Sequence, residues 1–178
     1  MTQHSPRTKS RIAGLFYLLT ILTGAFALLV KEPLRSVMLL SSTACYVAVT
    51  FLFYALFRPV NRSVSTIAAV VSLAGCALST LGLFHLGASR LNPLVLFGCY
   101  CLMIGYLIAR STFLPRALGV LMAAGGLGWL TFISPALAQY LSPYNMALGI
   151  VGETALTVWL LAVGVNAERW NVQASSPS

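Results

Sequence analysis

The chain has 178 residues, of which 58% are apolar and 8% charged, and its mean hydropathy is +0.88. Soluble domains carry roughly a quarter of their residues as charged side chains, so this composition all but excludes a water-soluble fold. The net charge is +8. Its basic residues stand at the ends of apolar runs rather than on one face, which argues against a nucleic-acid-binding surface.

Six apolar stretches run along the chain, separated by clusters of charge, proline and asparagine. They cover residues 12–30, 36–57, 64–88, 93–109, 117–140 and 144–166. A helix rises about 1.5 Å per residue and needs about 20 residues to cross the hydrocarbon layer, so each stretch predicts a transmembrane helix and only the fourth is short. We therefore expect an all-α fold, a single polytopic transmembrane helical bundle of about six spans over residues 12–166. A basic cytoplasmic tail over 1–11 precedes it, and a short cytoplasmic tail over 167–178, disordered beyond Trp170, follows it.

The lysines and arginines predict the orientation of these spans. Eight of them fall on the side of the N-terminus and three on the other side. The positive-inside rule then places both termini in the cytoplasm, and we expect a multi-pass protein of the cell membrane, specifically a bacterial inner membrane. In a rival topology the fourth and fifth stretches form one broken helix and the C-terminus lies outside. Arg110 and Arg116 bracket Pro115, and two arginines there are costly in hydrocarbon, so six spans are favoured.

Local signals predict how the helices pack. Pro135 inside the fifth stretch lacks a backbone donor, so it should kink that helix and free the carbonyl of Thr131. Small residues at close-packing spacing let helix backbones approach in lipid. The pairs are Gly75 with Ser79, Ala124 with Gly128, and Gly149 with Gly152.

Glu153 is the acidic residue that lies far from either membrane interface, near the middle of the last stretch. A charged carboxylate at the bilayer centre costs on the order of several kcal/mol, so Glu153 is expected to be protonated or paired inside the bundle. It is the candidate acid or base of a catalytic site. The alternative is a neutral carboxyl that hydrogen-bonds a neighbouring helix and only supports the fold.

Depth along the predicted spans places other side chains near the level of Glu153. Tyr46 and Tyr100 are the candidate catalytic partners. Depth alone does not decide whether such side chains face one another. The candidate ligand-binding residues are Thr23, Ser79, Trp129 and His85, of which His85 lies closest to the outer surface.

The sequence lacks the residues that several other kinds of site require. Cys99 and Cys101 stand about 200° apart around a helix and cannot share one metal ion. The glycines at 125, 126 and 128 lack the strand and the acidic residue of a dinucleotide site, and without any aspartate there is no Ser-His-Asp set. We therefore expect no metal and no cofactor, and cysteines that remain thiols.

Four strings of the sequence resemble a family of bacterial integral membrane proteins catalogued as domain of unknown function 4386. This resemblance extends over most of the chain and implies the fold and the location, not an activity. Where the resemblance leads us to expect a histidine before the cysteine of the fourth span, this chain has Tyr100 before Cys101. The strings are Arg11–Leu18, Gly105–Ser111, Phe113–Leu121, and Glu153 with Trp159–Leu160.

These features together predict an intramembrane pocket that opens to the outer half of the membrane or laterally to lipid. It would receive a lipophilic, lipid- or isoprenoid-like small molecule and present Glu153 to it. In an enzyme, protonated Glu153 would act as general acid on an alkene or epoxide, as in a terpene-type cyclase, with aromatic faces stabilising the cation. Two alternatives stay open: a small proton-coupled transporter, for which homo-oligomerisation would be needed, and a non-enzymatic accessory or structural subunit. The expected partners are the lipid bilayer and the lipophilic molecule, with no nucleic acid.

Overall fold

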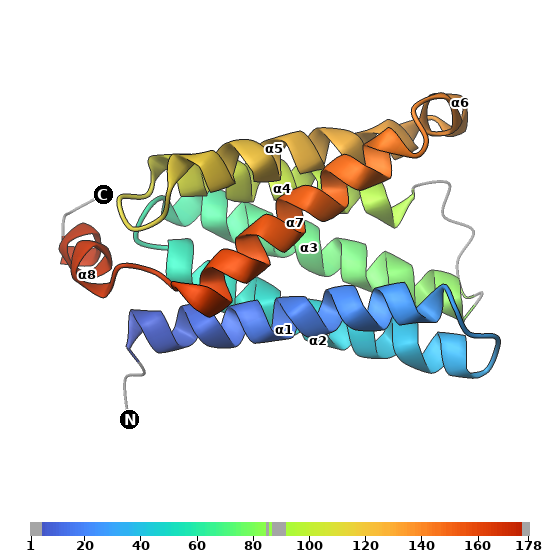
Figure 1. Ribbon diagram of the computed structural model, residues 1–178, viewed down its shortest axis with the longest axis horizontal. Helices are drawn as coiled ribbons and strands as arrows, with labels where there is room; N and C mark the ends of the chain where they lie inside the picture. The colour runs from blue at the N-terminus through green and yellow to red at the C-terminus, as the bar shows by residue number, and fades with distance from the viewer. Residues whose placement is uncertain (1–4, 85, 87–91, 176–178) are drawn as a thin grey trace.

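The computed structural model describes residues 5–84, 86 and 92–175, and over these residues it is helical without a strand (Figure 1). The predicted all-α fold is therefore confirmed. The elements are α1 (Pro6–Ala27), α2 (Leu34–Phe57), α3 (Arg62–Leu83), α4 (Pro93–Arg110), α5 (Arg116–Leu130), the 3-10 turn η1 (Thr131–Ile133), α6 (Pro135–Tyr140), α7 (Tyr144–Ala162) and α8 (Ala167–Ser175).

Six of these helical segments are long and apolar enough to cross a membrane. They are α1, α2, α3, α4, α5 continued through η1, and α7. The protein is thus a multi-pass membrane protein with six candidate spans. Helices α4 and α5 are separate and lie side by side, so the rival topology that joins them into one span is wrong.

The helices begin where short polar side chains cap them. Ser5 accepts a hydrogen bond from the Thr8 amide and Asn61 accepts one from Val64, at 3.3 Å and 3.0 Å. Each side chain satisfies an amide that the first helical turn leaves without a partner. Pro6 follows Ser5 as the first residue of α1, which therefore starts six residues before the predicted span.

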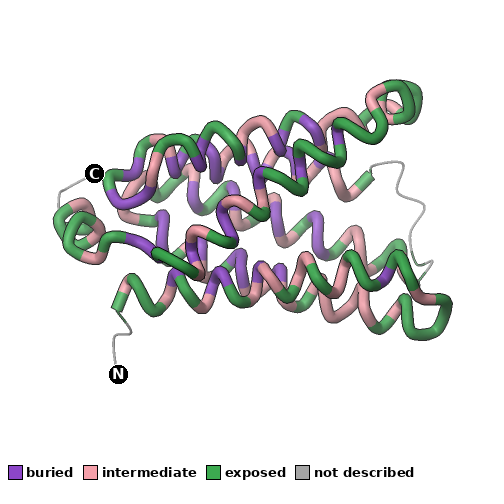
Figure 2. Tube along the Cα trace, in the orientation of Figure 1, coloured by how far each residue is buried: buried purple, intermediate pink, exposed green. Residues whose placement is uncertain are grey.

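Helix α7 crosses the bundle between α1 and α5, while α3 packs between α2 and α4 (Figure 1). Buried residues gather on the faces that the helices turn toward one another, and the outward faces are mostly exposed (Figure 2). Large apolar side chains such as Phe51, Val70 and Val120 are among the exposed ones. Such a surface suits hydrocarbon, in agreement with the six apolar spans.

Helices α4 and α5 approach each other closely through glycines. A Cβ on Gly105 would stand 2.7 Å from the Gly119 carbonyl oxygen, and a Cβ on Gly126 would stand 2.8 Å from that of Gly98. Any side chain at these positions would push the two backbones apart. The spacing of small residues in the sequence did not point to these two pairs, because the partners lie on different helices.

The fifth predicted stretch is not one kinked helix, and this expectation is corrected. Helix α5 ends at Leu130, and α6 begins anew at Pro135, where the Ser134 hydroxyl caps the Leu137 amide at 3.5 Å. The carbonyl of Thr131 is not freed, because it accepts a hydrogen bond from the Ser134 amide at 3.3 Å. A serine cap followed by proline starts a helix more readily than it kinks one.

The segment after Trp170 is ordered over the described residues, which corrects the expectation of a disordered tail. Residues 167–175 form α8, which is capped by Asn166 at the Arg169 amide. The Trp170 indole donates to the Leu56 carbonyl at 2.8 Å, and the Gln173 side chain accepts from the Thr112 amide at 3.0 Å. These contacts fasten α8 to α2 and to the loop between α4 and α5.

Candidate functional site around Glu153

Glu153 lies near the middle of α7 and contacts two other helices. Its Oε1 accepts a hydrogen bond from the Trp129 indole of α5 at 3.0 Å, and the Cys101 thiol of α4 lies 3.7 Å from the same oxygen. The side chain is half-buried. Among the described residues, hydrogen-bonding groups rather than a basic side chain make up its polar surroundings. Glu153 is therefore paired inside the bundle, but not with a cation.

Three buried tyrosines from three helices surround this carboxyl. Tyr17 of α1, Tyr46 of α2 and Tyr100 of α4 are 0%, 7% and 1% exposed. The Tyr46 ring centroid lies 5.7 Å from that of Tyr17 and 5.9 Å from that of Tyr100, in edge-to-face arrangements. All three are within electrostatic range of Glu153. We call Glu153 with its neighbours Trp129, Cys101, Tyr17, Tyr46 and Tyr100 the Glu153 cluster.

The hydroxyl groups of these tyrosines have no hydrogen-bond partner within the described part of the chain. The Tyr17 hydroxyl lies near the Glu153 carboxyl but does not meet hydrogen-bond geometry with it. An unsatisfied buried polar group costs about 1–3 kcal/mol, and such groups are rare in native proteins. Three such hydroxyls lie near one carboxyl.

Gly149 determines where Trp129 lies. The Trp129 indole packs directly over Gly149 on α7, in the space that a Cβ would fill. This position brings the indole nitrogen to Glu153, one helical turn further along α7. The sequence had marked Gly149 as a site of close helix approach, and the element that approaches is an aromatic side chain.

The structure brings together some of the predicted site residues and leaves others apart. Tyr46, Tyr100 and Trp129 lie near Glu153. Thr23 instead donates its hydroxyl to the Leu19 carbonyl in its own helix at 2.6 Å. Ser79 is half-buried on α3. His85 lies outside the described residues, so its placement stays a prediction.

Two members of the Glu153 cluster were missed by reasoning from the sequence. Tyr17 was not singled out, since it lies only five residues into the span predicted to begin at residue 12. The Ser5-Pro6 pair was the available signal, since it marks an earlier helix start and moves Tyr17 to the middle of α1. Cys101 was considered as a metal ligand and as a packed thiol, but not as a neighbour of Glu153.

The described residues contain no group of three metal-ligating side chains. Cys45, Cys76, Cys99 and Cys101 are free thiols. The Cys101 thiol is a weak donor that faces the carboxyl. The arrangement can hold a polar group by hydrogen bonds and can exchange a proton at Glu153.

Comparison with known proteins finds a family that part of the chain resembles. Residues 89–164 match the model of a family described as "Domain of unknown function (DUF4386)", and this segment holds Tyr100, Cys101, Trp129 and Glu153. A protein of Archaeoglobus fulgidus, described as "Uncharacterized protein", is 26% identical over 127 residues, which make up 66% of this chain and 76% of that relative. That relative is archaeal, so the matches do not show the family to be bacterial. No solved structure matches the chain at a significant level. The resemblance inferred from the sequence is confirmed over residues 89–164, which match the DUF4386 family model.

Proposed function

We propose that this protein binds a lipophilic small molecule within the membrane and holds the molecule's polar group at the Glu153 cluster. One observation carries this proposal: among the described residues, a half-buried carboxyl without a basic partner lies near three buried tyrosine hydroxyls that have no hydrogen-bond partner. A tyrosine hydroxyl can both donate and accept, and a protonated carboxyl can do the same. A ligand with a hydroxyl, carbonyl or amino group on an apolar body fits this set.

The route of entry is lateral in this proposal. Glu153 and Trp129 are each only half-buried, whereas the three tyrosines behind them are almost fully buried. The carboxyl is therefore reached from the side of α5 and α7 that faces lipid. Displacement of the Trp129 indole, which is hydrogen-bonded to Glu153, would open the way to the tyrosine hydroxyls.

The same geometry supports a chemical version of the proposal, an acid-initiated cyclisation. A protonated Glu153 would transfer its proton to an alkene or epoxide of the ligand, and a carboxylate and a carbocation would result. The rings of Tyr46 and Tyr100 would offer faces to that cation. Loss of a proton from the product cation back to Glu153 would complete the cycle.

The test is mass spectrometry of the organic extract from purified protein. Wild type is compared with Glu153→Gln, and Glu168→Gln is the matched control, because Glu168 is an exposed acid on α8. All samples are matched for bulk lipid and checked for folding by size-exclusion chromatography. We expect a specific lipophile in wild type and in the control that is lost or altered in Glu153→Gln. Identical bulk-lipid profiles in all three would contradict the proposal and favour transport or a structural role.

We also propose that the protein lies in the cell membrane with both termini in the cytoplasm. The beginning of α1 and the whole of α8 lie at the same end of the bundle, and this end carries the excess of basic residues (Figure 1). A membrane-impermeant thiol reagent tests this orientation. It should label Lys31→Cys in intact cells and Ser175→Cys only after lysis. The reverse pattern would overturn the orientation.

A further inference from the structure

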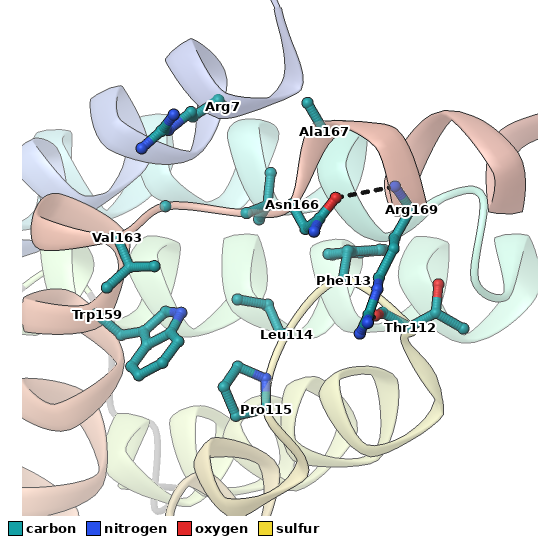
Figure 3. Close-up of a pocket in the computed structure, with 12 residues that line it drawn as sticks. Arg7, Thr112, Phe113, Leu114, Pro115, Trp159, Val163, Asn166, Ala167 and Arg169 are labelled. Atoms are coloured by element: carbon teal, nitrogen blue, oxygen red, sulfur yellow. Dashed lines mark hydrogen bonds between the residues drawn. The ribbon is translucent and has the colours of Figure 1, made fainter.

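A cavity lies where α1 begins and α7 ends, and no member of the Glu153 cluster lines it (Figure 3). Its volume is about 550 Å³, within the range of roughly 300–1,000 Å³ that is common for small-molecule sites. The walls come from α1, the loop between α4 and α5, the end of α7 and α8. Four segments that are distant in the sequence thus meet around one space.

The cavity is positively charged at its mouth. Arg7 and Arg169 both line it, and none of the described residues that line it is acidic. The Arg169 guanidinium donates to the Thr112 carbonyl at 3.4 Å, which holds it beside the opening. Gly164, with φ of 76°, turns the chain past Arg7, and a Cβ there would stand 3.2 Å from the Arg7 Cγ. Arg169 is therefore held beside the opening, and Gly164 lets the chain pass close to the Arg7 side chain.

A buried donor points to a ligand in the same cavity. The Trp159 indole nitrogen is buried and has no hydrogen-bond partner within the described part of the chain. Figure 3 shows this nitrogen on the side of the ring that faces Leu114 and the middle of the cavity. An indole nitrogen is a donor only, so the missing partner is an acceptor. The remaining wall near it is apolar, with Leu114 and Val163.

We propose that this cavity binds a phosphate-ester group carried by an amphiphile. The anion would lie between Arg7 and Arg169, since guanidinium groups bind phosphate oxygens with two donors at once. One oxygen would accept from Trp159, and the apolar part would extend along Leu114 and Val163 toward the bilayer. The matching chemistry is that of an anionic phospholipid or of a soluble phosphate ester with an apolar tail.

This site is independent of the Glu153 cluster. Trp159 follows Glu153 on α7 by six residues, about 9 Å along the helix, and belongs to a different wall of the bundle. The proposed ligand of the Glu153 cluster is recognised through a half-buried carboxyl, whereas the proposed ligand of this cavity is recognised through cations and an indole. Failure of one proposal therefore leaves the other standing.

The test measures the thermal unfolding midpoint of the full chain in a neutral detergent during lipid titration. Phosphatidylglycerol, phosphatidylcholine and glycerol 3-phosphate are titrated separately into wild type, Arg7→Gln/Arg169→Gln and Trp159→Phe. The matched control is Arg62→Gln, an exposed arginine at the same end of the bundle that is not among the residues lining the cavity. We expect phosphatidylglycerol to raise the midpoint of wild type and of the control at the same concentration. The double variant and Trp159→Phe should each need about tenfold more lipid, as for the loss of a charge-assisted hydrogen bond.

Each result of the titration either identifies the class of ligand or overturns the proposal. An equal response to glycerol 3-phosphate supports the site and assigns it to a soluble phosphate ester, whereas a response to the phospholipid alone assigns it to lipid. Equal responses of wild type and the double variant would overturn the proposal, as would equal responses to phosphatidylglycerol and phosphatidylcholine in wild type. Trp159→Phe leaves both arginines and the Arg169–Thr112 contact in place. It therefore keeps the test valid if the double variant loosens α8.

Discussion

Asn145 and Tyr100 are both polar side chains buried in an apolar bundle, but the fold treats them in opposite ways. The Asn145 amide nitrogen donates to the Thr131 hydroxyl at 2.9 Å and to the Ala138 carbonyl at 3.2 Å, and its oxygen accepts from the Met146 amide at 2.8 Å. The Tyr100 hydroxyl has no such partner among the described residues. Asn145 is 2% exposed and Tyr100 1%, so burial does not separate them.

This contrast distinguishes polar groups that stabilise the fold from polar groups whose hydrogen-bonding capacity is unused. Asn145 fastens the start of α7 to η1 and α6, and every hydrogen bond it makes replaces one that water would otherwise provide. The tyrosine hydroxyls of the Glu153 cluster contribute nothing comparable to the fold. A buried group with unused hydrogen-bonding capacity needs an explanation, and our proposal supplies one in the polar group of a ligand. Substitutions in the two regions should therefore differ in both stability and ligand retention.

The largest effect is expected for Asn145→Leu. It removes three hydrogen bonds and leaves the Ala138 carbonyl without the Asn145 donor, which should lower the free energy of unfolding by about 2–4 kcal/mol. The measurement is thermal unfolding in detergent, followed by intrinsic fluorescence. Met146→Leu, at a neighbouring exposed position, is the matched control and should change stability by about 0.5 kcal/mol or less. If the Asn145→Leu protein is as stable as this control, the hydrogen bonds of Asn145 do not stabilise the fold, and the contrast with Tyr100 is wrong.

A medium effect is expected for Gly149→Ala. The added Cβ would occupy the place of the Trp129 indole, so the indole must leave Glu153 or the helices must separate, at a cost of about 1–3 kcal/mol. Tryptophan emission should change together with the unfolding midpoint. Gly82→Ala is the matched control, because a Cβ there meets no atom within 4 Å. In a helix that control should be neutral or stabilising by up to about 1 kcal/mol. If the two variants have the same tryptophan emission and the same unfolding midpoint, the packing of Trp129 on Gly149 does not determine where the indole lies.

Much of the fold could be predicted because hydrocarbon imposes simple rules on a sequence. The thickness of the bilayer sets the length of each apolar stretch, and the cost of buried charge places arginines at the ends. The same cost makes an acid in mid-span conspicuous, so Glu153 could be found without a structure. Helix boundaries were harder, because Ser134 with Pro135 marks either a kink or a new start, and only the packing decides.

The sequence indicated how deep in the membrane the candidate side chains lie. It did not indicate which face of its helix each side chain occupies. Tyr46, Tyr100 and Thr23 share a level, but the Thr23 hydroxyl bonds within its own helix. Depth carries no information about which face a residue occupies. Helix α8 and the cavity beside Arg7 and Arg169 depend on contacts such as Trp170 with Leu56, which are far apart in the sequence. A local sequence pattern does not predict contacts between residues that are so far apart in the chain.

The smallest effect on stability, and the sharpest contrast, is expected for Tyr100→Phe. This change removes a hydroxyl that has no partner in the described structure, so the free energy of unfolding should change by less than about 0.5 kcal/mol or rise slightly. Thr50→Val is the matched control, because the Thr50 hydroxyl is also buried but lies 2.6 Å from that of Ser72. Its loss leaves Ser72 without that partner and should cost about 1–2 kcal/mol.

The amount of ligand retained should follow the opposite order, with the larger loss in Tyr100→Phe and the smaller loss in Thr50→Val. Tyr100→Phe removes a group available to the ligand, so the lipophile extracted with the protein should decrease, whereas Thr50→Val should retain it in proportion to the folded fraction. Mass spectrometry of extracts from equal amounts of folded protein separates the two quantities. A Tyr100→Phe protein that is destabilised as much as Thr50→Val and retains the same lipophile would mean that the tyrosine hydroxyl serves the fold. The contrast with Asn145 would then disappear, and the Glu153 cluster would be a second structural junction.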